Sequence, residues 1–162
     1  MIIVGIDPGT ATTGYSVIKV TKKAKSKKQQ VVCLKYGTIK TSPKHSPEKR
    51  LNQLYLQLSK ILKEYRPNFL VVEGVYFFKN LKTAFPVSEA RGVILLSAAK
   101  KRLKVYQVNP LQVKVGVCGY GRATKKEVQK AVKKTLKMKT IPQPDDAADA
   151  IAIALYGMQL IQ

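Results

Sequence analysis

The sequence predicts a mixed α/β domain in which an antiparallel meander is followed by parallel strands connected through helices. Two observations carry this expectation. Three stretches with a strand pattern come first, within residues 2–40, and amphipathic helical stretches then alternate with short apolar ones. The 162 residues suffice for one full core and are short for two, so we expect a single domain over residues 1–162.

The first forty residues predict three antiparallel strands. IIVGID (2–7) alternates as a strand does, PGTATTG (8–14) is typical of a turn, and YSVIKV (15–20) returns. A Lys-rich turn at 21–30 then leads to a third strand at 31–40. These lysines fit a solvated hairpin tip, which we favour over specific binding.

Helices and buried strands alternate in the middle of the chain. A helix is predicted from Ser46, its N-cap, to Pro67, with a stripe of leucines on one face. NFLVVEG (68–74) is almost wholly apolar, which is typical of a central strand covered on both faces. A second helix is expected over 85–102 and a buried strand over 103–109.

The last third of the chain is predicted to be helical. A short helix starts at Asn109-Pro110, and the glycine-rich loop CGYGRA (118–123) follows. Thr124 and Glu127 have the spacing of a capping box that begins the next helix, and residues 145–160 form the last. The expected order is β-β-β-α-β-α-β-α-α.

The composition is strongly basic, with 30 Lys and Arg against 9 Asp and Glu and a net charge of +21. Thermophile surfaces are also rich in Lys, but they usually gain Glu alongside it. The one-signed excess therefore favours a polyanionic partner. We expect nucleic acid and no membrane, because no basic anchor helix is evident and no apolar run approaches ~18 residues.

Cysteine and histidine usage narrows the possible chemistry. Cys33 and Cys118 form no CxxC pair and the N-terminus lacks signal-peptide features, which together indicate a cytoplasmic location. The one histidine, His45, stands in the polar stretch TSPKHSPEK, which argues against Ser-His-Asp chemistry and a Cys/His zinc site. Any catalysis must rely on carboxylates.

Four carboxylates from three distant segments are expected to meet. Asp7 and Glu73 end two apolar strands and would emerge at one edge if these strands are parallel neighbours. Asp146 and Asp149 are three residues apart and share one helix face. Such a cluster is costly without a cation, and oxygen ligands suit Mg²⁺ or Mn²⁺. Two such ions can activate a water and stabilise the leaving oxygen of a phosphodiester.

An ordinary structural role is the alternative to metal binding for each acid taken alone. Asp7 fits a turn, and Asp145 or Asp146 fits an ordinary helix N-cap. Glu73 at the end of an apolar strand and Asp149 among apolar neighbours are harder to explain in this way. The set therefore favours a metal site, with Asp145 expected as the N-cap of the last helix.

Five blocks, in order, resemble RuvC-type Holliday junction resolvases: GIDPGTATTGY, VVEGVYFFKN, ARGVILLSAA, VNPLQVKVGVCGYGRATKKEV and PDDAADAIAIA. The resemblance covers nearly the whole chain. It implies an RNase H-like fold with a mixed five-stranded sheet flanked by helices. It also implies a homodimeric endonuclease that makes paired, symmetric nicks in four-way DNA junctions. The implied cofactor is Mg²⁺, two ions per active site with Mn²⁺ as substitute, and a branch-migration helicase complex is the implied partner.

The resemblance also assigns residues. The family's catalytic, metal-binding acids fall on Asp7, Glu73, Asp146 and Asp149. Asp145 is an additional acid beside them. The basic residues near the scissile phosphate fall on Lys114 and Lys125, and the junction-contacting aromatic falls on Tyr76. The helix containing ARGVILLSAA matches the family's dimerisation helix.

The residues themselves fit DNA contacts at two places. The loop after the Glu73 strand carries side chains that can stack on unpaired bases or bind phosphate, although its aromatics also fit a minor core: Tyr76, Phe77, Phe78, Lys79 and Asn80. Lys114 and Lys125 flank the glycine-rich loop, where they fit phosphate contacts or plain surface charge.

Three alternatives to a Holliday junction resolvase differ in what the sequence would have to contain. A kinase or actin-like protein built on the GIDPGT hairpin would need a second phosphate hairpin, an adenosine pocket and about twice the length. A non-catalytic, basic nucleic-acid-binding protein would leave the acid cluster unexplained. A nuclease of the same fold acting on other branched DNA is the third alternative.

Overall fold

A five-stranded mixed sheet forms the centre of the protein, in a computed structural model that describes residues 1–22, 29–74 and 81–161. The strands lie in the order β3-β2-β1-β4-β5. β1 pairs antiparallel with β2 and parallel with β4, β2 pairs antiparallel with β3, and β4 pairs parallel with β5. The predicted meander followed by parallel strands is confirmed. The bounds are β1 (Ile2–Asp7), β2 (Thr12–Lys22), β3 (Gln29–Lys40), β4 (Phe69–Glu73) and β5 (Lys104–Val108).

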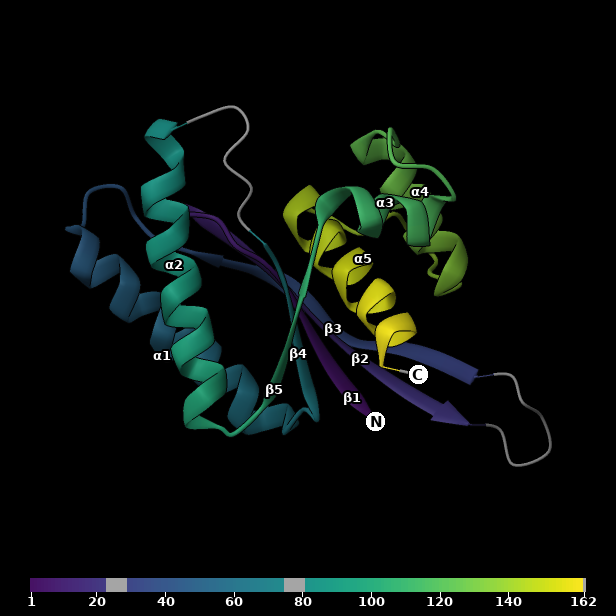
Figure 1. Cartoon of the computed structure of the whole chain (residues 1–162), viewed down its shortest axis with the longest axis horizontal. Helices are drawn as coiled ribbons and strands as arrows, with labels where there is room; N and C mark the ends of the chain where they lie inside the picture. The colour runs from purple at the N-terminus through teal and green to yellow at the C-terminus, as the bar shows by residue number, and fades with distance from the viewer. Residues whose placement is uncertain (23–28, 75–80, 162) are drawn as a thin grey trace.

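Helices cover both faces of the sheet (Figure 1). Two of them lie on one face and three on the other: α1 (Pro47–Tyr65) and α2 (Leu81–Lys100), opposite α3 (Pro110–Cys118), α4 (Lys125–Thr135) and α5 (Asp145–Leu160). The predicted order was one helix short, because the short helix expected at Asn109-Pro110 is an element of its own. Its N-terminus carries a capping box between Asn109 and Gln112.

Successive side chains of a strand lie on opposite faces of the sheet, so a residue's position in the strand determines its face. Val4 and Ile6 of β1 belong to the core formed with α1 and α2. Ile3 and Val71 belong to the core formed with α5. Asp7 and Glu73 continue this second, odd-numbered series, so the two strand ends direct their acids to the side of α5.

Small residues let α5 lie directly on β1 and β2. A Cβ atom at Gly5 would collide with the carbonyl oxygen of Ala150, and one at Gly14 would collide with the carbonyl oxygen of Asp146. The buried Ser16 hydroxyl donates a hydrogen bond to the Ala150 carbonyl at 2.8 Å. This close approach fixes the N-terminal turns of α5 above the sheet.

Some predicted boundaries were wrong. α2 begins at Leu81 rather than at residue 85, so Pro86 lies inside the helix. A proline inside a helix removes one backbone hydrogen bond, which the helix tolerates here. β2 begins at Thr12, inside the predicted turn, because Thr12 and Thr13 pair with the end of β3 and β-branched residues suit a strand. Among the described residues, we find no helix with the length and apolarity needed to cross a membrane.

Candidate active site

The carboxyl ends of two parallel strands bring the first two acids together. Ile6 of β1 pairs with Val72 of β4, and the next residue on each strand is Asp7 or Glu73. Both side chains lie on the α5 side of the sheet. The expectation that these acids emerge at one edge is confirmed, because it depended only on the parallel pairing of two neighbouring strands.

A cavity of about 290 Å³ lies where these strand ends meet α3, α4 and α5. Its charged walls come from five residues: Asp7, Glu73, Lys114, Lys125 and Asp149. Apolar side chains such as Val113 and Val128 line the remainder. Three of the four predicted acids and both predicted lysines therefore share one cavity.

Asp146 takes a different place from the other three acids. It does not line the cavity, but its charge is one of the causes that raise the pKa of Asp7. It lies one turn before Asp149 on α5, at the point where the helix backbone touches Gly14. Asp146 thus lies beside the other three acids, on the side of the cavity nearest to β2.

Burial and mutual repulsion disfavour the charged forms of these acids. Burial, followed by the charges of Glu73, Asp149 and Asp146, raises the pKa of Asp7 to about 8. Burial and then Asp149 raise the pKa of Glu73 to about 7, against the lowering effect of Lys114. Burial also raises the pKa of Asp149, although Lys125 lowers it. A bound cation would offset the negative charge that burial and mutual repulsion disfavour.

The donor chemistry of the site fits hard divalent ions. All four acids offer only oxygen ligands, which Mg²⁺ and Mn²⁺ prefer. In the ranges that the structure describes, no three potential ligands are arranged closely enough to enclose an ion by themselves. The acids are therefore grouped around a shared cavity, and their charge and burial, rather than a closed cage, indicate affinity for a cation.

Asp145 does not cap α5, and this prediction was wrong. Pro144 occupies the N-cap position in extended geometry, and its carbonyl accepts hydrogen bonds from the amides of Ala147 and Ala148. Asp145 is the first helical residue, and its Oδ2 atom accepts a hydrogen bond from Lys125 Nζ at 2.7 Å. This hydrogen bond is the main reason why the pKa of Asp145 is lowered and that of Lys125 is raised.

A second contact near the cavity, between Tyr120 and Glu127, was not predicted from the sequence. The predicted capping box is present, since Thr124 Oγ1 accepts from the Glu127 amide and Glu127 Oε2 accepts from the Thr124 amide. In addition, the Tyr120 hydroxyl donates to Glu127 Oε1. The glycine-rich loop is thereby tied to the first turn of α4, where Lys125 stands. The capping-box spacing was a usable signal, whereas nothing in the spacing pointed to Tyr120.

Four predicted DNA contacts lie outside the described residues. These are Tyr76, Phe77, Lys79 and Asn80.

Comparison with known proteins identifies the family. The family model described as "Crossover junction endodeoxyribonuclease RuvC" matches residues 3–156. The chain belongs to the RuvC family. All five sequence blocks that suggested this resemblance lie within the matched residues.

Individual RuvC proteins are similar over nearly their whole length. The chain is 46% identical to the crossover junction endodeoxyribonuclease RuvC of Natranaerobius thermophilus, over 98% of this chain and 95% of the relative. It is also 46% identical to the protein of that name from Finegoldia magna, over 96% and 91%. The structure of Thermus thermophilus RuvC in complex with a Holliday junction substrate superposes with a TM-score of 0.89 at 32% identity, covering 99% of this chain and 94% of the other. The predicted RNase H-like fold is confirmed.

Proposed function

We propose that this RuvC-family chain is a structure-specific endodeoxyribonuclease that resolves four-way (Holliday) DNA junctions by paired, symmetric nicks. The observation that carries the proposal is the meeting of Asp7, Glu73 and Asp149 in one cavity flanked by Lys114 and Lys125. A net charge of +21 suits a DNA substrate. The similarity to a RuvC structure that holds a Holliday junction supports the choice of substrate.

The four acids Asp7, Glu73, Asp146 and Asp149 would hold the metal, which we propose to be two Mg²⁺ ions with Mn²⁺ as substitute. Such ions supply an activated water and stabilise the leaving oxygen of the phosphodiester. The raised pKa values of Asp7 and Glu73 support the assignment, because a bound cation compensates the charge that burial disfavours.

The remaining residues of the cavity would bind and orient the DNA. Lys114 and Lys125, which line the cavity, would contact the backbone near the scissile phosphate. Asp145 holds Lys125 beside the cavity, and a DNA phosphate would compete with Asp145 for its ammonium group. The N-terminus of α5 would offset part of the negative charge of Asp146 and Asp149. Among residues 75–80, Tyr76, Phe77, Lys79 and Asn80 would contact the junction.

Paired nicks require two active sites, and we propose that a homodimer provides them. The segment ARGVILLSAA lies on α2, which leaves Phe85 76% exposed and Leu96 52% exposed. These are the apolar side chains of α2 that a second copy of the chain would cover in the proposed dimer. We further propose cytoplasmic location and association with a branch-migration helicase complex.

A cleavage assay on defined DNA forms would test the proposal. Purified protein with Mg²⁺ would be incubated with a four-way junction, a three-way junction, a flap and a linear duplex of the same sequence. We expect symmetric nicks in the four-way junction alone, and an Asp7→Asn preparation controls for contaminating nucleases. Preferential cutting of another form would favour a nuclease for other branched DNA. Tight junction binding without cutting would favour the non-catalytic alternative.

A further inference from the structure

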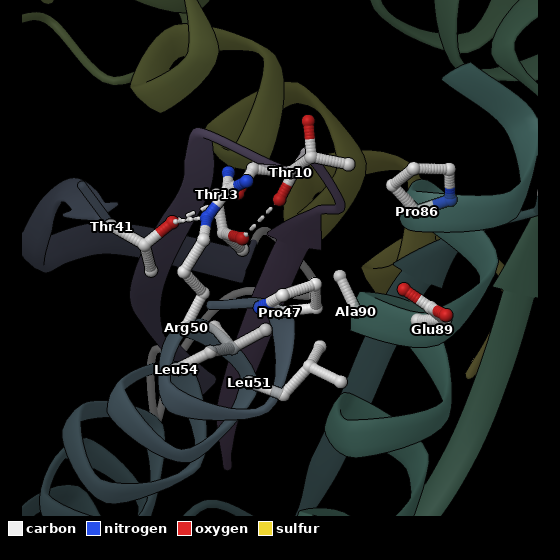
Figure 2. Close-up of a pocket in the computed structure, with 11 residues that line it drawn as sticks. Thr10, Thr13, Thr41, Pro47, Arg50, Leu51, Leu54, Pro86, Glu89 and Ala90 are labelled. Atoms are coloured by element: carbon white, nitrogen blue, oxygen red, sulfur yellow. Dashed lines mark hydrogen bonds between the residues drawn. The ribbon is translucent and has the colours of Figure 1, made fainter. Parts of the chain in front are cut away.

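The turn between β1 and β2 is held by an arginine from a distant helix. This turn, residues 8–11, directly follows Asp7. Arg50 of α1 donates from Nη2 to the carbonyl oxygen of Thr10 and from Nε to Thr41 Oγ1 at 3.0 Å. Figure 2 shows the guanidinium group directed at both threonines. Because a guanidinium is planar, two donors used in different directions fix its orientation.

Thr41, at the end of β3, completes the network. Its hydroxyl accepts from Arg50 and donates to the Thr10 carbonyl at 2.9 Å, and its amide donates to the Ala11 carbonyl at 3.0 Å. Within the same turn, Thr13 Oγ1 donates to the Gly9 carbonyl at 3.0 Å. The side chains of Arg50 and Thr41 thus both donate a hydrogen bond to the carbonyl oxygen of Thr10.

The adjoining cavity favours a supporting role over a ligand site. A cavity of about 110 Å³ lies beside this network, on the α1 and α2 side of the sheet (Figure 2). The hydroxyl protons of Thr13 and Thr41 are used on backbone carbonyls, and Arg50 donates to Thr10 and Thr41, which reduces the donors left for an anion. Glu89 on the opposite wall would repel an anion as well. The arrangement therefore fixes backbone rather than binding a small molecule.

The turn is tight, so a displacement of the Thr10 backbone would also displace the neighbouring residues of the turn. A Cβ atom at Gly9 would collide with the carbonyl oxygen of Thr12, so the backbone at this turn is packed closely. Asp7 is three residues from Thr10, at the start of this turn, and its side chain lies on the opposite face of the sheet.

We propose that Arg50 is a positioning residue for Asp7: together with Thr41 it fixes the β1–β2 turn and so the place of the Asp7 carboxylate in the metal site. The inference rests on the proposed function. Residues that orient a metal ligand typically contribute about 10- to 100-fold to metal affinity.

Matched variants of the full-length protein test this role. Arg50→Met removes both donors, while Lys49→Met removes the same charge from the neighbouring, exposed position as a control. Thr41→Val removes the bridging hydroxyl, and Thr41→Ser retains it. Four quantities would be measured: Mn²⁺ affinity without DNA by calorimetry, the single-turnover rate of junction cleavage, junction affinity in EDTA, and the thermal midpoint.

We expect Arg50→Met and Thr41→Val to weaken Mn²⁺ binding about 10-fold and to slow cleavage by about 10- to 100-fold. Junction affinity should stay unchanged, and Thr41→Ser and Lys49→Met should behave like the unmodified protein. The Arg50→Met/Thr41→Val double variant should be no worse than the more damaged single variant, because both act on one carbonyl.

Mn²⁺ affinity in Arg50→Met equal to that in Lys49→Met would overturn the proposal. So would a loss of junction affinity with a flatter salt dependence, since that result would show a direct phosphate contact. If Arg50→Met does not fold, the comparison of Thr41→Val with Thr41→Ser decides. If the unmodified protein leaves junctions intact, the proposed function fails, while the Mn²⁺ comparison still decides the role of Arg50.

Discussion

Lys125 Nζ lies 2.7 Å from Asp145 Oδ2, so the first residue of α4 is joined to the first residue of α5. The lysine side chain is 63% exposed and the aspartate 45% exposed. An ion pair in such surroundings adds little to stability, typically about 0–1 kcal/mol. Its effect is to hold an ammonium group beside the acid cavity, at a point where DNA phosphate would compete with Asp145.

The first prediction follows from this pair. Asp145→Asn and Asp145→Ala should behave alike, with nearly unchanged thermal midpoints, because Asp145 is not the N-cap. Junction affinity should be equal or tighter in both, since Lys125 is released for phosphate. Binding and melting experiments on the two variants would check this. An alanine variant that is clearly less stable than the asparagine variant would show that Asp145 caps the helix after all.

The second prediction concerns Lys125 itself. Lys125→Ala should slow junction cleavage and reduce the slope of log affinity against log salt by about 0.9, the value for one lost phosphate contact. Affinity measured over a salt series would provide the slope. An unchanged slope and rate would assign Lys125 to ordinary surface charge.

The third prediction concerns metal. Cleavage should require Mg²⁺ or Mn²⁺ and stop with excess chelator, while junction binding persists in a gel-shift assay. Substantial cutting in EDTA would contradict the assignment of the four acids.

The fourth prediction separates chemistry from binding. Asp7→Asn and Glu73→Gln should lower the nicking rate by orders of magnitude, and junction affinity should stay equal or become tighter because negative charge near phosphate is removed. Rates and affinities measured on the same preparations would test both parts. Loss of binding in a folded variant would indicate that the acid is structural.

The fifth prediction concerns pH and stability without metal. The pKa of Asp7 is raised from 3.8 to about 8, so between these values the folded protein binds more protons than the unfolded chain. Stability in EDTA should therefore fall as pH rises from about 4 to about 8. Asp7→Asn should be the more stable protein at neutral pH and should show a weaker pH dependence. Thermal midpoints over this pH range, with and without Mg²⁺, would measure it. A midpoint that rises with pH would contradict a buried, protonated Asp7.

Prediction from the sequence succeeded where the periodicity of a strand or helix determines where a side chain lies. Asp7 and Glu73 were placed correctly because two apolar strands with acids at their carboxyl ends must present them together if the strands are parallel. Asp149 was predicted to join them because it stands among apolar neighbours on the last helix, and it lines the same cavity. Each inference used local pattern plus one general rule of topology.

Prediction from the sequence failed where the outcome depends on the backbone angles of a single residue or on contacts between residues far apart in the chain. Asp145 was assigned as N-cap, but the extended geometry of Pro144 moves the helix start by one residue. Arg50 gave no signal, because its partner Thr10 is 40 residues away in the sequence. The start of α2 was predicted at residue 85, whereas the helix begins at Leu81 and continues through Pro86.

The contact between Gly14 and the carbonyl oxygen of Asp146 limits how this protein can be made more robust. Replacing glycine by alanine is a common route to a stiffer chain, and filling space behind a helix is another. Here either change would push α5 away from the sheet and carry Asp146 and Asp149 away from Asp7. Thermostability and turnover are therefore coupled at this interface, so variants selected for heat resistance should acquire their substitutions elsewhere in the molecule.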